Sequence, residues 1–187
     1  MNLRIVELCI GAAMLAAVSM SVHAAQLSDI RSYTVADEGL LNLYVPRHWT
    51  DKRSELSIGL PRTIRFSANE GERFEVLFSA RWSGRQDPTV VEPNFLLSVA
   101  AYGAKIVAPQ AMEPELEVRS LPTHSGEAYV FAATDKDPKP GEYRYMVQGA
   151  MNVQGLVCTF TILSEQQNSP AVADAIEMIR TASFVAN

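Results

Sequence analysis

Cysteine is scarce in this chain of 187 residues, which contains only Cys9 and Cys158. Cys9 lies in an N-terminal segment with the features of a cleaved leader. Its removal would leave one cysteine, and one cysteine cannot form an internal disulfide. Cys158 shares one face of an alternating segment with Leu156 and Phe160. We expect it to be buried as a small hydrophobic residue, because no neighbouring residue activates it as a nucleophile.

Histidine is also scarce, and the common catalytic and metal-binding motifs are missing. Beyond the N-terminal segment only His48 and His124 are present, both in turn-like segments. The sequence has no G-x-S-x-G elbow, no H-E-x-x-H or C-x-x-C motif and no glycine-rich dinucleotide loop. We therefore expect no metal and no cofactor. The enzymatic alternative is a spatial site with either histidine near Ser125, Cys158 or a carboxylate.

The chain has no basic run. Its 16 Lys and Arg residues are outnumbered by 21 Asp and Glu residues, which gives a formal net charge of −5. Phosphate contacts require clustered Lys and Arg, so we expect no nucleic-acid partner. After residue 24 no apolar segment approaches the about 20 residues that cross a bilayer. We therefore expect no membrane span after signal cleavage.

The first 24 residues have the pattern of a signal peptide. Arg4 and the α-amine give a positive start, and residues 8–20 are apolar and uncharged. Val22 and Ala24 then occupy the positions of a small-x-small cleavage site. The sequence therefore predicts a signal peptide over residues 1–24, and a periplasmic or secreted location.

Two other roles for this leader do not fit the sequence as well. A membrane anchor needs a span of about 20 apolar residues, and the run at 8–20 is shorter. A lipoprotein signal requires a cysteine just after the apolar run, a place that Cys9 does not occupy. Cleavage is the interpretation that fits both the length and the flanks, and residues 25–187 are then expected to form a single α+β domain.

Two tryptophans are candidates for contact with a partner. Trp49 and Trp82 both fall at strand ends or in loops. Exposed tryptophans often anchor binding surfaces. The alternative is that they pack at the rim of the hydrophobic core.

Three glutamates are further candidates. Glu113, Glu115 and Glu117 alternate, so on a strand they would share one face. Carboxylates on one face suit a hard cation or a basic partner. A solvated edge strand is the alternative, which Pro114 favours.

Alternation and turn residues predict a sheet of eight strands. Most consecutive strands are joined by tight turns, so the sheet should be largely antiparallel. Residues 50–60 are polar, and we expect them to be irregular. The strands are expected at residues 33–35, 41–45, 63–67, 73–81, 116–121, 127–133, 142–149 and 156–163.

Two helices complete the pattern. Pro93 opens the first, over 93–107, and Ser169 with Pro170 opens the second. The apolar stripe of the first helix consists of Phe95, Val99, Tyr102 and Ile106. That of the second consists of Val172, Ile176, Ile179 and Ser183, with Phe184 beside them. We expect an α+β fold with a mostly antiparallel sheet and two main helices. A β-sandwich with one terminal helix is the alternative.

Three short segments resemble a known group of exported proteins. Residues 45–49 read V-P-R-H-W, residues 126–130 read G-E-A-Y-V and residues 179–184 read I-R-T-A-S-F. They resemble the V-P-x-x-W after the first hairpin, the strand after a glycine turn and the closing Ser-Phe pair of PsbP-like and DcrB-like proteins. The resemblance spans about residues 33–184. It implies an α/β/α sandwich and a mostly non-enzymatic role, and it transfers no catalytic residue.

These observations favour an exported, non-enzymatic accessory or binding protein of the cell envelope. We expect it to act through contacts with another envelope protein. An unrecognised small hydrolase or ligand-binding enzyme and a structural envelope component are the two alternatives. The candidate contact residues are Trp49, Trp82, Glu113, Glu115 and Glu117.

Overall fold

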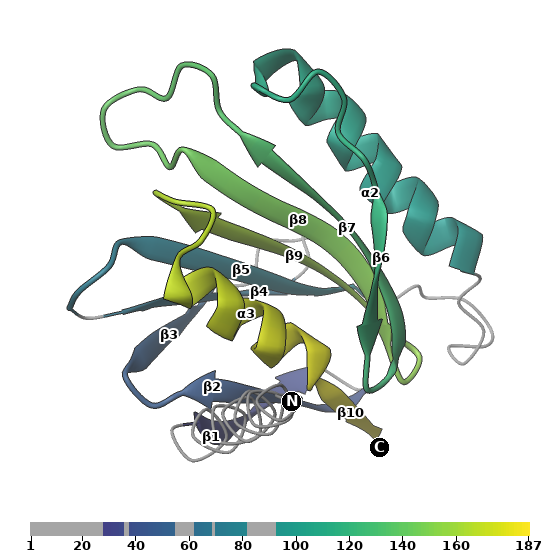
Figure 1. The fold of residues 1–187 in the computed structure, drawn as a ribbon. Coiled ribbons are helices and arrows are strands. Elements are labelled where there is room, and N and C mark those ends of the chain that lie inside the picture. Colours follow the sequence, from purple (N-terminus) through teal and green to yellow (C-terminus); the bar gives the residue numbers. More distant parts are fainter. Residues whose placement is uncertain (1–27, 36–37, 55–61, 69, 82–92) are drawn as a thin grey trace, which may run out of the picture.

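The computed structural model describes residues 28–35, 38–54, 62–68, 70–81 and 93–187. These residues form two antiparallel sheets and two helices, which confirms the predicted α+β fold (Figure 1). The predicted signal peptide at residues 1–24 and the candidate Trp82 lie outside the described residues.

The smaller sheet joins the first hairpin to a strand from much later in the chain. β1 (Ser28–Val35) and β2 (Gly39–Pro46) form the predicted antiparallel hairpin, and β10 (Ser183–Ala186) pairs with the other side of β2. A side chain at Gly39 would collide with the Val185 carbonyl, so this close approach of β2 and β10 requires glycine.

The strand β10 corrects the sequence prediction, which placed Ser183 and Phe184 on the final helix. The helix α3 (Pro170–Arg180) ends earlier, and Thr181 has left helical geometry with ψ near 1°. The extended backbone lets Phe184 pair with Leu41 of β2 while its own side chain is buried in the core. Burial of this aromatic ring therefore favours a strand at a position that periodicity assigned to a helix.

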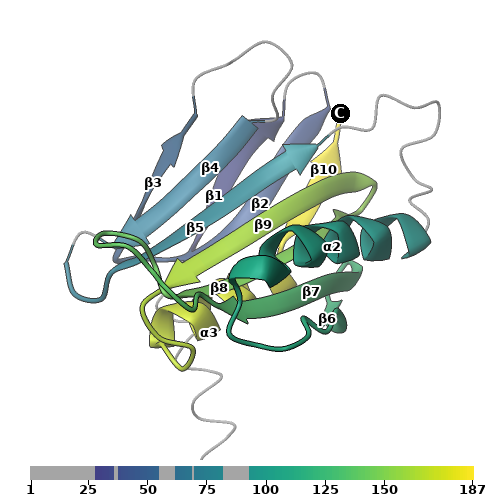
Figure 2. The same ribbon diagram turned by 90° about the horizontal axis from the view of Figure 1, so that it is seen from above.

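The larger sheet contains seven strands and curves away from the smaller one. All of its neighbouring strands are antiparallel, and their order is β3-β4-β5-β9-β8-β7-β6. Figure 2 shows the strands fanning out, with α2 over the side that holds β7 and β8. Their bounds are β3 (Trp49–Arg53), β4 (Arg62–Ala68), β5 (Phe74–Arg81), β6 (Arg119–Thr123), β7 (Gly126–Thr134), β8 (Tyr145–Val153) and β9 (Leu156–Ser164).

Strand β3 was not predicted, because its residues are polar and lack clear alternation. It pairs with β4, and Arg31 of β1 supports it from the other sheet. The Arg31 guanidinium forms an ion pair with Asp51 at 2.6 Å and donates to the Trp49 carbonyl at 2.7 Å. The predicted irregular segment at 50–60 is thus wrong at its start, and residues 55–61 lie outside the described part.

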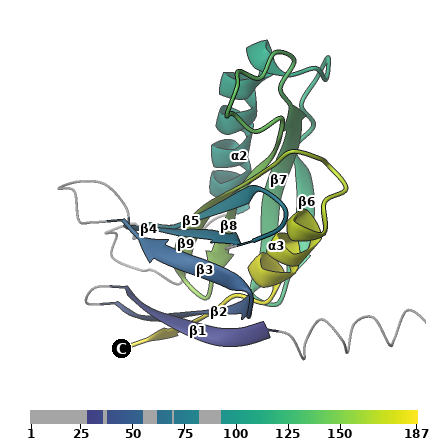
Figure 3. The same cartoon turned by 90° about the vertical axis from the view of Figure 1, so that its left-hand side faces the viewer.

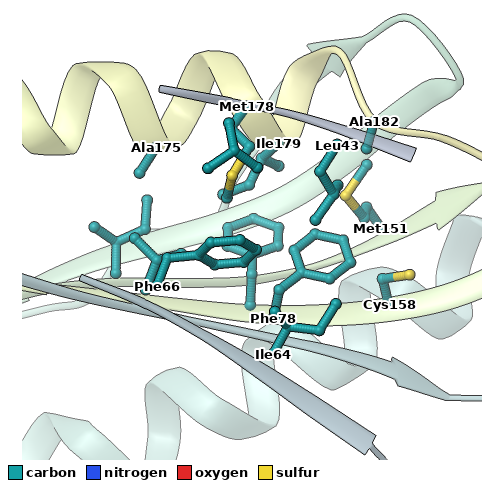
Figure 4. Close-up of a cluster of buried hydrophobic side chains, with 14 of the residues drawn as sticks. Leu43, Ile64, Phe66, Phe78, Met151, Cys158, Ala175, Met178, Ile179 and Ala182 are labelled. Atoms are coloured by element: carbon teal, nitrogen blue, oxygen red, sulfur yellow. The ribbon is translucent and has the colours of Figure 1, made fainter. Parts of the chain in front are cut away.

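The main core lies between the two sheets and α3. Ser169 caps α3 by accepting the Ala171 N–H, and the helix then buries its apolar face against the sheets. Complete burial of one such aliphatic or aromatic side chain stabilises the fold by about 1.5–3 kcal/mol. Figure 4 shows this cluster, which includes Leu43, Ile64, Phe66, Phe78, Met151, Cys158, Ala175, Met178, Ile179 and Ala182.

The helix α2 (Pro93–Val107) lies on the opposite face of the larger sheet and continues into the short 3-10 helix η1 (Ala108–Gln110). It covers β7 and β8, and Figure 3 shows it on the far side of the large sheet from β1 and β2. The helix bounds confirm the prediction for residues 93–107.

The buried face of α2 differs from the predicted one. Leu96, Ala100 and Ala104 are buried against the sheet. A Cβ atom on Gly103 would lie 3.1 Å from the side chains of both Gln148 and Phe131, so the helix backbone sits close to the strands. Small residues allow this close approach. The larger apolar stripe that the sequence suggested for the core faces outward instead.

Candidate functional site

Trp49 is a core residue and not a surface anchor. Its side chain is only 2% exposed, and its ring lies 4.6 Å from that of Phe74, measured between centroids. On β3 it pairs with Ala68 of β4. The prediction that Trp49 contacts a partner is therefore corrected in favour of packing. For the second tryptophan, Trp82, contact stays a prediction.

The three glutamates do not share a face as predicted. β6 begins at Arg119, so residues 113–117 precede the strand and are not extended in a ladder. The Thr134 N–H donates to both Glu113 carboxylate oxygens, at 2.9 and 3.1 Å. Partial burial acts to raise the pKa of the Glu113 carboxyl, but these bonds outweigh it and hold the pKa below its ordinary value. Glu113 therefore anchors the link from α2 to β6.

The other two glutamates are exposed. Glu117 forms an ion pair with Arg119 at 2.7 Å, and both side chains face solvent. Such exposed pairs contribute about 1 kcal/mol at most. Across the described ranges no group of three or more His, Cys, Asp and Glu side chains is arranged to hold a metal ion.

The residues considered for a catalytic site lie apart. Cys158 is fully buried, as predicted, and burial raises the pKa of its thiol far above the ordinary value. The Ser125 hydroxyl donates to the Ala182 carbonyl at 3.0 Å. His48 and His124 are both exposed on turns. The structure brings neither histidine into a hydrogen bond with Ser125 or Cys158.

His48 does have one acidic neighbour. Partial burial raises the pKa of the Asp174 carboxyl on α3, and the nearby charge of His48 partly opposes this rise. No hydrogen bond links these two side chains within the described structure.

An open cleft of about 340 Å³ lies beside the β4–β5 turn. Arg73 lines this cleft, and the described contacts of its side chain are all with other parts of the fold. Its guanidinium stacks 4.2 Å from the Tyr143 ring centroid, pairs with Glu165 at 2.8 Å and donates to the Gly141 carbonyl. These contacts connect the β4–β5 turn, the β7–β8 loop and the end of β9. The remaining lining residues are Ser67, Ala68, Glu70, Gly71, Glu72 and Phe74.

The outward surface of α2 is the strongest candidate for a functional site. Phe95, Tyr102 and Ile106 are 51%, 67% and 59% exposed, and Val99 is half-buried among them. We call these four residues the α2 stripe. They recur at intervals of four, three and four residues, which places them on one face of the helix. Lys105 is the one charged residue of α2.

The α2 stripe faces along the sheet and not only into solvent. Val99 packs against a small cluster of Leu96, Ala150 of β8 and Val157 of β9. The stripe therefore lies on the flank of α2 that looks towards β9. Figure 2 shows β9 and β5 on that side of the helix.

The sequence pattern identified these four residues as the apolar stripe of the helix but did not distinguish a surface role from burial. Leu96, Ala100 and Ala104 also recur at helical spacing, and Ala100, Gly103 and Ala104 among their neighbours on this side of the helix are small. A helix that packs closely on a sheet uses such small residues at the contact. That second stripe was the available signal for a surface role of the first.

Within the described residues, neither helix has the length and apolar composition to cross a bilayer. The chain matches no family model and no curated protein.

Proposed function

We propose that this chain is an exported, non-enzymatic accessory or binding protein of the cell envelope, and that the α2 stripe is its contact surface. One observation carries the proposal: three large apolar side chains on one helix face are each more than half exposed. Contiguous apolar patches on soluble domains commonly mark interaction sites. Aromatic residues are enriched where such contacts contribute most of the binding energy.

Two further features support this function. The N-terminal sequence has the pattern of a signal peptide, and the resemblance to PsbP-like and DcrB-like proteins points to a non-enzymatic role in the envelope. Cys158 is fully buried and the Ser125 hydroxyl is bonded to a backbone carbonyl. These placements give no support to the hydrolase alternative within the described part of the chain.

The test is capture of a partner from an envelope extract by the tagged full chain. We expect a protein to be retained by the wild type and lost with Tyr102→Ser. Tyr44→Ser is the matched control, because Tyr44 is an exposed tyrosine on the smaller sheet. Equal retention by both variants, or the absence of any retained protein, would count against the proposal. Trp82→Ala in the same experiment tests the prediction for that residue.

A further inference from the structure

The α2 stripe borders a part of the larger sheet that no described element covers. We propose that the stripe and this part of the sheet together bind one amphipathic helix of a partner protein, and that this helix carries carboxylates along its edges. The inference rests on the proposed function, because it names the kind of partner that the same surface takes. A row of paired residues, the width beside α2 and unbalanced positive charge support it.

One row of directly paired residues crosses the larger sheet from its outer edge to the strands under α2. Its members, taken from β3 through β4, β5 and β9 to β8, are Lys52, Arg65, Leu77, Thr161 and Gln148. Directly paired residues share a face of the sheet. The row ends under α2, where a Cβ atom on Gly103 would lie 3.1 Å from the Gln148 side chain. The whole row therefore lies on the face that carries α2, and the helix covers only its Gln148 end.

The uncovered part of this face is wide enough for one more helix. α2 packs on β7 and β8, so a second helix at the usual axis separation of about 8–10 Å would lie over β9 and β5. Neighbouring strands are about 4.8 Å apart, which places β4 and β3 along the far side of such a helix. Figures 2 and 3 show β3, β4 and β5 extending away from α2.

A helix in this position meets apolar side chains on two of its sides. The α2 stripe lies on the flank of α2 that looks towards β9. On the sheet, Leu77 of β5 and Leu163 of β9 are half-buried and lie on the same face, because Leu163 pairs with Glu75, two residues before Leu77. Contact on two adjacent sides requires a broad apolar stripe, which is what an amphipathic helix provides.

Unbalanced positive charge borders the same surface. Lys52 and Arg65 are exposed and directly opposite each other, an arrangement in which like charges destabilise a sheet. Arg65 has a carboxylate partner in Glu75 at 3.3 Å. Within the described part of the chain neither Lys52 nor Lys105, which follows Tyr102 by three residues, has such a partner. Carboxylates on a bound helix would balance both lysines, so charge selects an acidic helix.

Designed peptides test the proposal on the full chain. The probe is a helical peptide of about 14 residues, long enough to span the α2 stripe, with leucines on one face and glutamates on both edges. The matched peptide has lysines in place of the glutamates. Fluorescence anisotropy should give a Kd of roughly 10–500 µM for the acidic peptide and at least tenfold weaker binding of the basic one. Added salt should weaken the binding of the acidic peptide.

The net charge of the chain makes this comparison stringent. The chain carries a formal charge of −5, so non-specific attraction favours the basic peptide. A preference for the acidic peptide therefore reports local positive charge. Equal binding of the two peptides, or no binding of the acidic peptide up to about 1 mM, overturns the proposal.

Variants locate the bound peptide. Tyr102→Ser and Lys52→Glu should each weaken binding of the acidic peptide at least fivefold, and Lys52→Glu should also strengthen binding of the basic peptide. Tyr44→Ser on the smaller sheet and Lys139→Glu in the β7–β8 loop are the matched controls, because both residues are exposed away from this surface. Circular dichroism confirms that all four variants are folded. Binding that is indifferent to Lys52→Glu, or that Lys139→Glu weakens equally, overturns the proposal.

The two proposals fail in different ways. Capture of an envelope protein that depends on Tyr102 but not on Lys52 overturns the acidic helix and leaves the proposed function standing. The expected pattern of peptide binding without any captured envelope protein supports the helix-binding surface and counts against the proposed function.

Discussion

The Gln154 side-chain carbonyl accepts a hydrogen bond from the Phe184 N–H at 2.7 Å, which ties the β8–β9 turn to β10. Gln154 and Gly155 form a two-residue turn with φ of 50° and 95°. Such turns usually carry asparagine at the first position. Gln154 is the one non-glycine residue with positive φ among the residues described, and its longer side chain reaches the edge of β10.

Gln154→Ala is expected to destabilise the fold by about 1–2 kcal/mol, because the buried end of β10 loses its acceptor. Gln154→Glu keeps an acceptor oxygen on a side chain of the same length, so it should lose less stability than Gln154→Ala. Gln154→Gly removes the bond but relieves the positive φ, so its loss should also be smaller than that of alanine. Urea unfolding measures all three. Identical stabilities for the alanine and glutamate variants would show that the bond contributes nothing.

Leu96 and Phe95 are sequence neighbours of which one is buried and the other half-exposed, which makes them a matched pair. Leu96→Ala should lower the free energy of unfolding by about 2–3 kcal/mol, because removal of a buried leucine side chain leaves a cavity. Phe95→Ala should cost less than about 1 kcal/mol, because its ring is half-exposed. Urea unfolding at low protein concentration measures the free energy of unfolding of both variants. A larger loss of stability for Phe95→Ala than for Leu96→Ala would indicate that the α2 stripe is buried in the core.

Leu96 and Phe95 also show which feature of the fold could not be predicted from the sequence. The hairpins β1–β2, β4–β5 and β8–β9 were predictable because their turn residues and alternation are local. Helix α2 was predictable in extent because Pro93 and its periodicity are local as well. Which of its two stripes is buried depends on how closely the helix approaches β7 and β8, and the small residues of the second stripe were the one local signal of a close approach.

The misplaced elements share a second cause. Trp49 lies at a strand end, but its burial depends on Phe74, 25 positions away in the chain. β10 exists because Phe184 pairs with Leu41 across most of the chain. Pairings at such separations leave no mark on the periodicity of either segment. The candidate contact surface was therefore found only once the packing was known.

Glu113 gives a pH dependence with a defined sign. Its pKa is lowered in the folded chain, so its carboxylate stabilises the fold above the unfolded pKa. That contribution is lost as the pH falls through the folded value. Glu113→Gln should therefore reduce stability at neutral pH, with the difference shrinking between about pH 5 and pH 3. Urea midpoints across this range measure the effect.

The control for this pH series is Glu117→Gln. Glu117 is exposed and pairs only with the exposed Arg119 among the contacts described. Its stability should follow that of the wild type at every pH. A difference between Glu113→Gln and the wild type that is constant with pH would contradict the role of the Glu113 charge.

Cys158 is expected to behave as a hydrophobic residue. Its thiol should not react with a disulfide reagent in the native protein, and it should react at the rate of unfolding in urea. An exposed cysteine introduced by Ser98→Cys is the control that reacts at once. Cys158→Ser should cost about 1–3 kcal/mol, more than Cys158→Ala, because it buries a hydroxyl in an apolar cluster. Rapid native labelling at Cys158 would contradict this.

The signal-peptide prediction is tested by expression in a bacterial host with a periplasm. Mass spectrometry should find a processed chain that begins at Ala25. Ala24→Leu should block processing, because the cleavage site requires a small residue there. Ser21→Ala, one position outside the two recognised residues, should be processed normally. Recovery of an intact 187-residue chain from the wild type would contradict cleavage.

The pairing of β10 with β2 has a consequence for the order of events during synthesis. Asn42 and its partner Ser183 are 141 positions apart, so β2 emerges long before the strand that covers its second side. At about 5–20 residues per second the ribosome needs roughly 7–30 s to bridge this interval. Meanwhile β2 presents an unpaired edge flanked by apolar side chains, the feature that recruits foreign strands. The nascent hairpin is thus the segment whose protection, by a chaperone or by delayed folding, should limit the yield of the native protein.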